Sequence, residues 1–177
     1  MFSDKASRAD NQQERLEISN WLAGFTDGEG AFTVSILKNP TSKIGWLVFP
    51  EFIVTQGAKS KEVLDLFKEI LKCGNVYVNR RFDNHNEDIY RFCVRSLKDL
   101  NTKVIPFFTE HRLRTHKKID FDIFCEVMKC VSNGKHLHTL GLKEIANLAM
   151  KMNRKVKPKF LESPLTICQT PRKSEKR

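Results

Sequence analysis

The sequence predicts an α+β fold in which helices alternate with two β-hairpins in the order α-β-β-α-β-β-α. Two patterns predict it: apolar residues recur at helical spacing in several separate segments, and two pairs of alternating apolar and polar runs are each joined by a polar turn. The chain has 177 residues, of which 40% are apolar, so we expect one core. No apolar run approaches the about 20 residues of a membrane span.

The first helix is predicted at about Ile18–Asp27, where apolar side chains recur at helical spacing before Gly28 and Gly30. A strand over Ala31–Leu37 follows, because large apolar residues alternate there with small or polar ones. It forms a hairpin with Trp46–Gln56, a run rich in aromatic and β-branched residues.

A second helix begins after Ser60, a residue type that favours helix starts, and Gly74 ends it. The second hairpin joins Asn75–Phe82 to Ile89–Arg95, with one apolar face and one face of Tyr, Asn and Arg. Later helices are expected at Leu97–Val104, Ile119–Cys130 and Thr139–Met152, with Pro106 between the first two.

The net charge of +10 is unevenly distributed along the chain. Residues 151–177 hold nine Lys and Arg residues and two acidic ones, so the rest is close to neutral. We therefore divide the chain into an N-terminal arm (1–15), a folded domain (16–153) and a basic C-terminal tail (154–177), which we expect to be loosely ordered past Pro158.

The polar N-terminus contains no signal peptide, so we expect a soluble, intracellular protein without a membrane partner. The five cysteines include no CxxC pair, which favours reduced thiols over disulfides or a zinc site. His136 and His138 stand alone as an HxH pair, which is more often part of a loop than a metal site.

The end of the first helix breaks two local rules. Gly24 and Gly28 lie on one helix face, where a glycine costs about 1 kcal/mol relative to alanine unless another backbone packs closely against it. Asp27 and Glu29 place negative charge where the helix dipole disfavours it, an effect that a bound divalent cation would reverse. The alternative is that Gly28-Glu29-Gly30 is only a helix-to-strand turn.

The segment Leu22-Ala23-Gly24-Phe25-Thr26-Asp27-Gly28-Glu29-Gly30 resembles the motif of the LAGLIDADG homing endonucleases. The order of elements, Val54-Thr55-Gln56, Gly74-Asn75-Val76-Tyr77 and Lys117-Lys118-Ile119-Asp120-Phe121 are also similar to that family. The resemblance covers about Ile18–Asn153. It implies a four-stranded antiparallel saddle-shaped sheet with helices on one face, which lies in the major groove of DNA.

The resemblance also implies the site residues. Glu29 is the acidic metal ligand, and the Gly28 carbonyl completes a Mg²⁺ site in which Mn²⁺ is a substitute. Asp27 ranks second and supports the helix ends. Gln56 orders water, unless it is only a solvated strand end. Lys117 stabilises phosphate charge, with Lys118 and His116 as alternatives because the register of this basic run is open; the run is otherwise a phosphate-contacting or solvated face.

Only one copy of the motif is present, and a close-packing helix needs a partner, so we expect a homodimer and a pseudo-palindromic DNA site. The predicted interface residues are Leu22, Ala23, Gly24, Phe25, Asp27 and Gly28. The predicted DNA-binding residues lie opposite the apolar strand faces, a choice that a one-residue shift would reverse. They are Thr33, Ser35, Glu51, Ile53, Tyr77, Asn79, Arg81, Arg91 and Arg95, together with Lys118 near the active site.

The combined expectation is an intron-encoded, site-specific double-strand DNA endonuclease that acts as a homodimer with Mg²⁺ and no small-molecule cofactor. As the resemblance implies, it is made inside a chloroplast or mitochondrion. The alternative is an intron maturase or a DNA-binding regulator that does not cleave. The carboxylate of Glu29 favours the nuclease, because a pure binder gains nothing from a negative charge beside phosphate.

Overall fold

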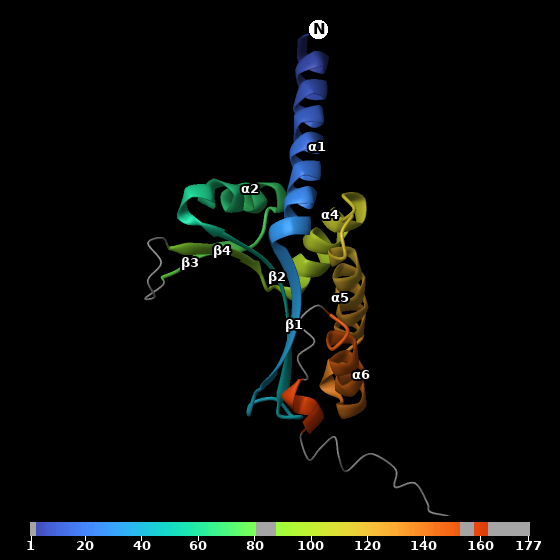
Figure 1. Ribbon diagram of the computed structural model, residues 1–177. Helices are drawn as coiled ribbons and strands as arrows, with labels where there is room; N and C mark the ends of the chain where they lie inside the picture. Colours follow the sequence, from blue (N-terminus) through green and yellow to red (C-terminus); the bar gives the residue numbers. More distant parts are fainter. Residues whose placement is uncertain (1–2, 81–87, 153–157, 163–177) are drawn as a thin grey trace, which may run out of the picture. The chain divides into compact units, whose positions relative to one another are not determined.

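The structure is a computed structural model of the chain, and it describes residues 3–80, 88–152 and 158–162. The helices and strands follow the predicted α-β-β-α-β-β-α order (Figure 1). They are α1 (Ser3–Glu29), β1 (Gly30–Lys38), β2 (Trp46–Gly57), α2 (Lys61–Leu71), β3 (Asn75–Asn79), β4 (Ile89–Val94), α3 (Leu97–Asp99), α4 (Ile105–Glu110), α5 (Lys117–Ser132) and α6 (Thr139–Ala149). The predicted α+β class is confirmed.

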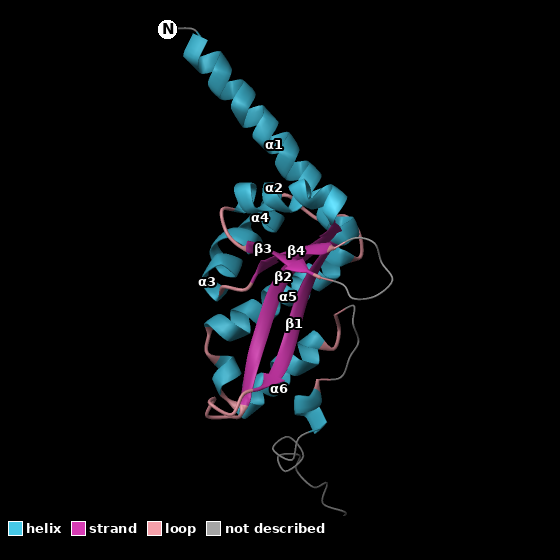
Figure 2. Cartoon of the chain, turned by 90° about the vertical axis from the view of Figure 1, so that its left-hand side faces the viewer, coloured by secondary structure: helices cyan, strands magenta, loops and turns pink. Residues whose placement is uncertain are grey.

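The strands form one sheet in the order β1-β2-β4-β3. Strand β4 pairs antiparallel with both β2 and β3, with Val54 opposite Phe92 and Val76 opposite the same residue on the other side. Figure 2 shows β1 and β2 as long neighbouring strands. The sheet order therefore makes β2 and β4 inner strands, whose side chains have neighbours on both sides.

The contacts divide the chain into two units, which we describe separately: Met1–Phe32 with Glu51–Lys118, and Thr33–Pro50 with Ile119–Arg177. In the first unit, Phe67 of α2 packs on Phe52 and Phe92, with ring centroids 6.1 and 5.7 Å away. Phe108 of α4 lies 5.1 Å from Phe52. Both helices therefore cover the same face of β2 and β4.

The second unit has its own apolar core, to which α5, α6, the end of β1 and the start of β2 contribute. Its buried members include Trp46, Val127, Leu142 and Phe160. The ring centroids of Trp46 and Phe160 are 5.6 Å apart. Phe160 belongs to a short 3₁₀ turn, Lys159–Glu162, inside the segment that we expected to be a loose tail.

The start of α1 and the region around Pro106 differ from the sequence-based expectation. Helix α1 starts at Ser3, well before Ile18. Pro106 does not separate two helices, because a π-helical turn over Leu100–Val104 leads directly into α4. A proline ring collides with the carbonyl four residues back in a regular α-helix, and the wider π turn avoids that collision. Helix α2 begins after Ser60 as expected, but without a hydrogen bond from that side chain.

The four cysteines within the described ranges, Cys73, Cys93, Cys125 and Cys130, are free thiols, as expected. Burial raises the pKa of Cys73 and of Cys125 to about 11, so both are protonated and unreactive at neutral pH. Among the residues that the structure describes, no helix is long and apolar enough to cross a membrane.

Candidate functional site

The carboxyl end of α1 is joined to the segment between α4 and α5 through Asp27. Its carboxylate accepts hydrogen bonds from the backbone N–H of Arg114 at 2.7 Å, the backbone N–H of Thr115 at 3.2 Å and the hydroxyl of Thr115 at 2.7 Å. Three donors thus compensate a charge that the helix dipole disfavours. Asp27 has the supporting role that we expected of it.

Burial raises the pKa of Asp27, but the hydrogen bonds from Arg114 and Thr115 and the charge of Lys117 together outweigh that effect. The net result is a pKa below the ordinary value for an aspartate. The side chain is therefore ionised at neutral pH, and the ionised form stabilises the junction.

Lys117, the first residue of α5, reaches the same helix end. Its ammonium group donates to the Gly28 carbonyl at 3.3 Å and to the Gly30 carbonyl. A positive charge on carbonyls at a helix carboxyl end is favourable. Glu29 lies between those two residues in the chain and is exposed. The structure therefore places the Lys117 ammonium group against the two carbonyls that flank Glu29 in the chain, and the predicted roles of these residues stay predictions.

The two alternatives to Lys117 lie differently. His116 and Lys118 are both exposed, whereas Lys117 is partly buried and contacts the end of α1. Farther back in the same segment, buried His111 is hydrogen-bonded through Nδ1 to the Asn20 side chain of α1 at 2.9 Å. His111 and Asp27 thus attach the basic segment to α1 at two points. These two contacts fix the backbone position of Lys117 relative to the end of α1.

Gln56 is the second-last residue of β2 and pairs with Tyr90 of β4. It is partly buried and has the phase of Phe52 and Val54, so it belongs to the sheet face that the helices cover. Its predicted role in ordering water stays a prediction.

The opposite face of the sheet in the first unit carries the predicted polar residues. Directly opposed residues share a face, so the pairing of Tyr77 and Thr55 with Arg91 places all three together. Glu51 of β2 lies four residues from Thr55, and Arg95, directly after β4, lies four residues from Arg91, so both continue the same alternation. The predicted phase is therefore correct, and it adds exposed Thr55, which the period of two from Glu51 and Ile53 could have identified.

Two of the predicted DNA-contacting residues on this face are not available as expected. Ile53 is only 7% exposed and lies opposite Cys93, which is 3% exposed. Both occupy inner strands of the sheet, whose side chains have neighbours on both sides. Glu51 is also 7% exposed. Its carboxylate forms hydrogen bonds with Arg91 and Arg95 within the chain.

The remaining predicted contact residues lie where the strand pattern placed them or outside the described ranges. Thr33 and Ser35 of β1 are partly exposed and alternate with Phe32, Val34 and Ile36, which pack on core residues. Asn79 is the last residue of β3 and pairs with Ile89. Arg81 lies outside the described residues.

Helix α1 has two distinct faces beside its carboxyl end. Ser19, Leu22, Ala23 and Thr26 are at most 5% exposed and form the inner face. Trp21, Gly24 and Gly28 are exposed, and Phe25 beside them is partly exposed. The prediction that Leu22 and Ala23 face a partner is wrong, because their side chains are buried in their own chain.

The two glycines on the outer face have no packing partner within the described part of the chain. A Cβ atom added at Gly24 or at Gly28 would meet nothing within 4 Å. Gly30, in contrast, is required locally, because its Cβ would lie 2.5 Å from the Thr26 side chain. The fold of one chain therefore explains Gly30 and leaves Gly24 and Gly28 unexplained.

The described residues of one chain include no group of three or more His, Cys, Asp and Glu side chains that could hold a metal ion. The exposed carboxylate of Glu29 and the adjacent Gly28 carbonyl are hard oxygen donors of the kind that Mg²⁺ accepts. They fit a magnesium site in chemistry.

Known proteins resemble this chain over most of its length. The family model described as LAGLIDADG endonuclease matches residues 22–128. A relative from Neurospora crassa, "Probable intron-encoded endonuclease 3", is 32% identical over 140 residues, which is 78% of this chain and 25% of the relative. The chain thus spans well under half the length of that curated relative. The DNA endonuclease I-CeuI of Chlamydomonas moewusii is 34% identical over 107 residues, which is 60% of this chain and 47% of I-CeuI.

Solved structures agree with this match. The crystal structure of a homing endonuclease, I-TnaI, is 34% identical with a TM-score of 0.74, over 81% of this chain and 93% of that one. The LAGLIDADG homing endonuclease I-LtrWI, crystallised with its target DNA, is 32% identical with a TM-score of 0.75, over 82% of this chain and 48% of that one. These likenesses cover both the motif helix and the sheet, and the chain belongs to the LAGLIDADG endonuclease family.

Proposed function

We propose that the protein is a site-specific DNA endonuclease that cuts both strands of a duplex as a homodimer, by Mg²⁺-dependent hydrolysis of phosphodiester bonds. The observation that carries the proposal is the end of α1, where the ammonium group of Lys117 donates to the Gly28 carbonyl and the next residue, Glu29, is exposed. These are the groups that hydrolysis of a phosphodiester requires: oxygen ligands for a cation and a positive charge for the phosphate.

Glu29 and the Gly28 carbonyl hold the Mg²⁺ ion, and Mn²⁺ is its substitute. The ion, when bound, supplies positive charge that neutralises the developing charge on the phosphate oxygens. Lys117 donates to the Gly28 carbonyl, so its ammonium group would supply a second positive charge at the end of α1 where the ion would bind. Gln56 orients the attacking water.

Two observations support the homodimer. Gly24 and Gly28 leave the outer face of α1 open to a second backbone. Glycine destabilises a helix, and no close packing at these two positions within the described part of one chain offsets that cost. The part of I-LtrWI that matches this chain is about half of that protein, so two copies of this chain would supply an equivalent amount of structure. A two-fold dimer places both Glu29 residues near one axis and selects a pseudo-palindromic site.

The sheet face of Tyr77, Arg91 and Arg95 is the proposed surface for the DNA major groove, since arginine can recognise guanine edges. The relatives' names describe intron-encoded endonucleases, which supports the same genetic origin here. Synthesis within a chloroplast or mitochondrion stays part of the proposal. The alternative of a maturase or a non-cleaving regulator does not explain why Glu29 is left exposed beside Lys117.

The proposal is tested with a randomised duplex library. The wild-type chain selects a site in Ca²⁺, and cleavage of that site is then measured in Mg²⁺. We expect the wild type to cut both strands and Glu29→Gln to bind the selected site without cutting it.

Glu14→Gln is the matched control, because Glu14 is also an exposed glutamate of α1 and the charge change is the same. We expect it to cut like the wild type. Cleavage by Glu29→Gln at the wild-type rate would remove Glu29 from the mechanism, and binding without cleavage by the wild type would favour the regulator.

A further inference from the structure

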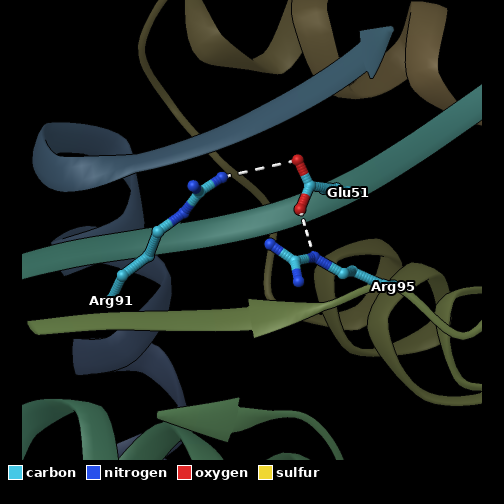
Figure 3. Close-up of polar contacts among 3 residues, drawn as sticks. All are labelled: Glu51, Arg91 and Arg95. Carbon is cyan, nitrogen blue, oxygen red and sulfur yellow. Dashed lines mark hydrogen bonds and ion pairs between the residues drawn. The ribbon is translucent and has the colours of Figure 1, made fainter. Parts of the chain in front are cut away.

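Glu51 lies between two arginines on the polar face of the sheet (Figure 3). Its Oε1 accepts a hydrogen bond from Nε of Arg95 at 2.5 Å, and its Oε2 accepts one from Nη2 of Arg91 at 3.4 Å. The carboxylate side chain is 10% exposed, while those of Arg91 and Arg95 are 37% and 43% exposed. The anion is thus covered, and the two cations reach outward from it.

This cluster crosses the sheet. Glu51 comes from β2, Arg91 comes from β4, and Arg95 directly follows β4. The guanidinium of Arg95 lies 5.5 Å from the ring centroid of Tyr77 on β3. The opposite face of the same strands carries Phe52 and Phe92, which pack on Phe67. The charges are therefore separate from the core, and core packing does not account for them.

The two arginines contact Glu51 through different nitrogen atoms of the guanidinium, which carries five N–H donors. Arg95 uses its Nε–H for Glu51. In Arg91 the Nε atom is buried without a hydrogen-bond partner among the described residues, so its contact with Glu51 through Nη2 is what orients the group. The hydrogen bond to Glu51, more than any other cause, raises the pKa of Arg95, so its charge is permanent.

From this geometry we infer that Glu51 is a specificity-determining positioning residue, which holds Arg91 and Arg95 in the orientation that reads guanine in the major groove of duplex DNA. This inference rests on the proposed function. A long arginine side chain can otherwise turn to a phosphate, which carries no sequence information. The buried carboxylate restrains that motion, and it lowers the net charge of the three groups to a single positive one, which weakens attraction to phosphate in general.

The test compares Glu51→Gln with the wild type. Glutamine has nearly the same shape but no charge, so the arginines lose their restraint and the face gains one positive charge. Affinity is measured in Ca²⁺, over a series of salt concentrations, for the duplex that the wild type selects, for single-base variants of it, and for a scrambled duplex.

We expect discrimination at the base pairs that the arginines read to fall about tenfold, since a bidentate contact gives discrimination of that order. Affinity for scrambled DNA should rise, and the slope of log K against log salt should steepen by up to about 0.9 per subunit. Arg95→Gln should lose discrimination at one of the base pairs at which Glu51→Gln also loses it. At that base pair, the double variant should discriminate no worse than Arg95→Gln alone.

Asp65→Asn is the matched control. It removes the same charge from an exposed ion pair with Lys61 on α2, which packs on the other face of the sheet, and should change none of the ratios. Thermal unfolding verifies that the variants fold. If Glu51→Gln does not, Glu51→Asp keeps the charge but has a shorter reach, and should lose discrimination without a change in salt slope.

Unchanged discrimination in a folded Glu51 variant, with the wild type still selecting and cutting a site, would overturn this inference and leave the proposed function intact. A wild-type chain that selects no duplex site would overturn both.

Discussion

Asp27 connects the motif helix to the residue that we assign to phosphate stabilisation. It accepts hydrogen bonds from Arg114 and Thr115, three and two residues before Lys117. Lys117 in turn donates to the carbonyl of Gly28, next to Asp27 in the chain. At the scale of residues, the site is thus a closed set of contacts between the end of α1 and the start of α5.

Asp27→Asn should lower the free energy of unfolding by about 1–3 kcal/mol at pH 7, because it removes a charged acceptor of several hydrogen bonds. The folded-state pKa of Asp27 is depressed, so its stabilisation is present above the unfolded-state pKa and is lost as the pH falls through the folded-state value. The difference between variant and wild type should therefore shrink below about pH 4. Denaturant unfolding at several pH values measures it.

Asp65→Asn serves as the control, since its exposed ion pair should contribute less than about 1 kcal/mol. A loss of stability in Asp27→Asn that stays constant down to pH 3 would contradict the assignment.

The residue types of the site could be predicted from the motif, but their contacts could not. The resemblance identified Glu29 and Lys117, and alternation along the strands gave the correct phase for Arg91 and Arg95. The burial of Ile53 depends on which strands lie beside β2, and a single sequence does not reveal strand order. The pairing of Glu51 with both arginines depends on the register of β2 and β4 for the same reason.

At the scale of elements, α1 is amphipathic in an unusual way, with an inner face that is buried and an outer face of exposed Trp21, Gly24 and Gly28. Apolar periodicity predicted the helix only from Ile18. The residues before it are mostly polar, and a helix without a buried face leaves no apolar pattern. Its helicity there is supported locally, as by the 3.0 Å hydrogen bond from Gln13 to Glu17 one turn later.

Gly24→Leu should dissociate the dimer while leaving the monomer folded, because the space around Gly24 is open in one chain and closed by a partner in the proposal. Sedimentation velocity over a concentration series measures association, and circular dichroism verifies the fold. The control is Gln12→Leu, which adds the same side chain to an exposed position of α1 about 120° around the helix from Gly24. A Gly24→Leu variant that associates like the wild type would exclude this face from the interface.

At the scale of the whole molecule, the basic C-terminal segment also contains a residue of the apolar core. Phe160 is 1% exposed in the core of the second unit, although the surrounding sequence is basic and polar. Composition averaged over residues 154–177 conceals one aromatic residue, and only the structure pairs it with Trp46. A truncation that keeps this core contact must therefore retain Phe160.

Two truncations separate these roles. Removal of residues 163–177 takes away four basic residues and one acidic residue, and should weaken DNA binding similarly for all sequences and flatten its salt dependence. Removal of residues 159–177 also removes Phe160, and should cost about 3–5 kcal/mol of stability in addition. Binding at several salt concentrations and denaturant unfolding distinguish the two. Loss of site preference in the shorter deletion would contradict a non-specific role for that segment.

The central claim is that two copies of the chain share one cleavage site. Mixing wild-type and Glu29→Gln chains at defined ratios, with time for subunits to exchange, tests it most directly through double-strand cleavage of the selected duplex. If each cut requires two functional subunits, activity follows the square of the wild-type fraction, and an equal mixture retains about a quarter of the activity. Activity proportional to the wild-type fraction, about half in the equal mixture, would show that single chains act alone.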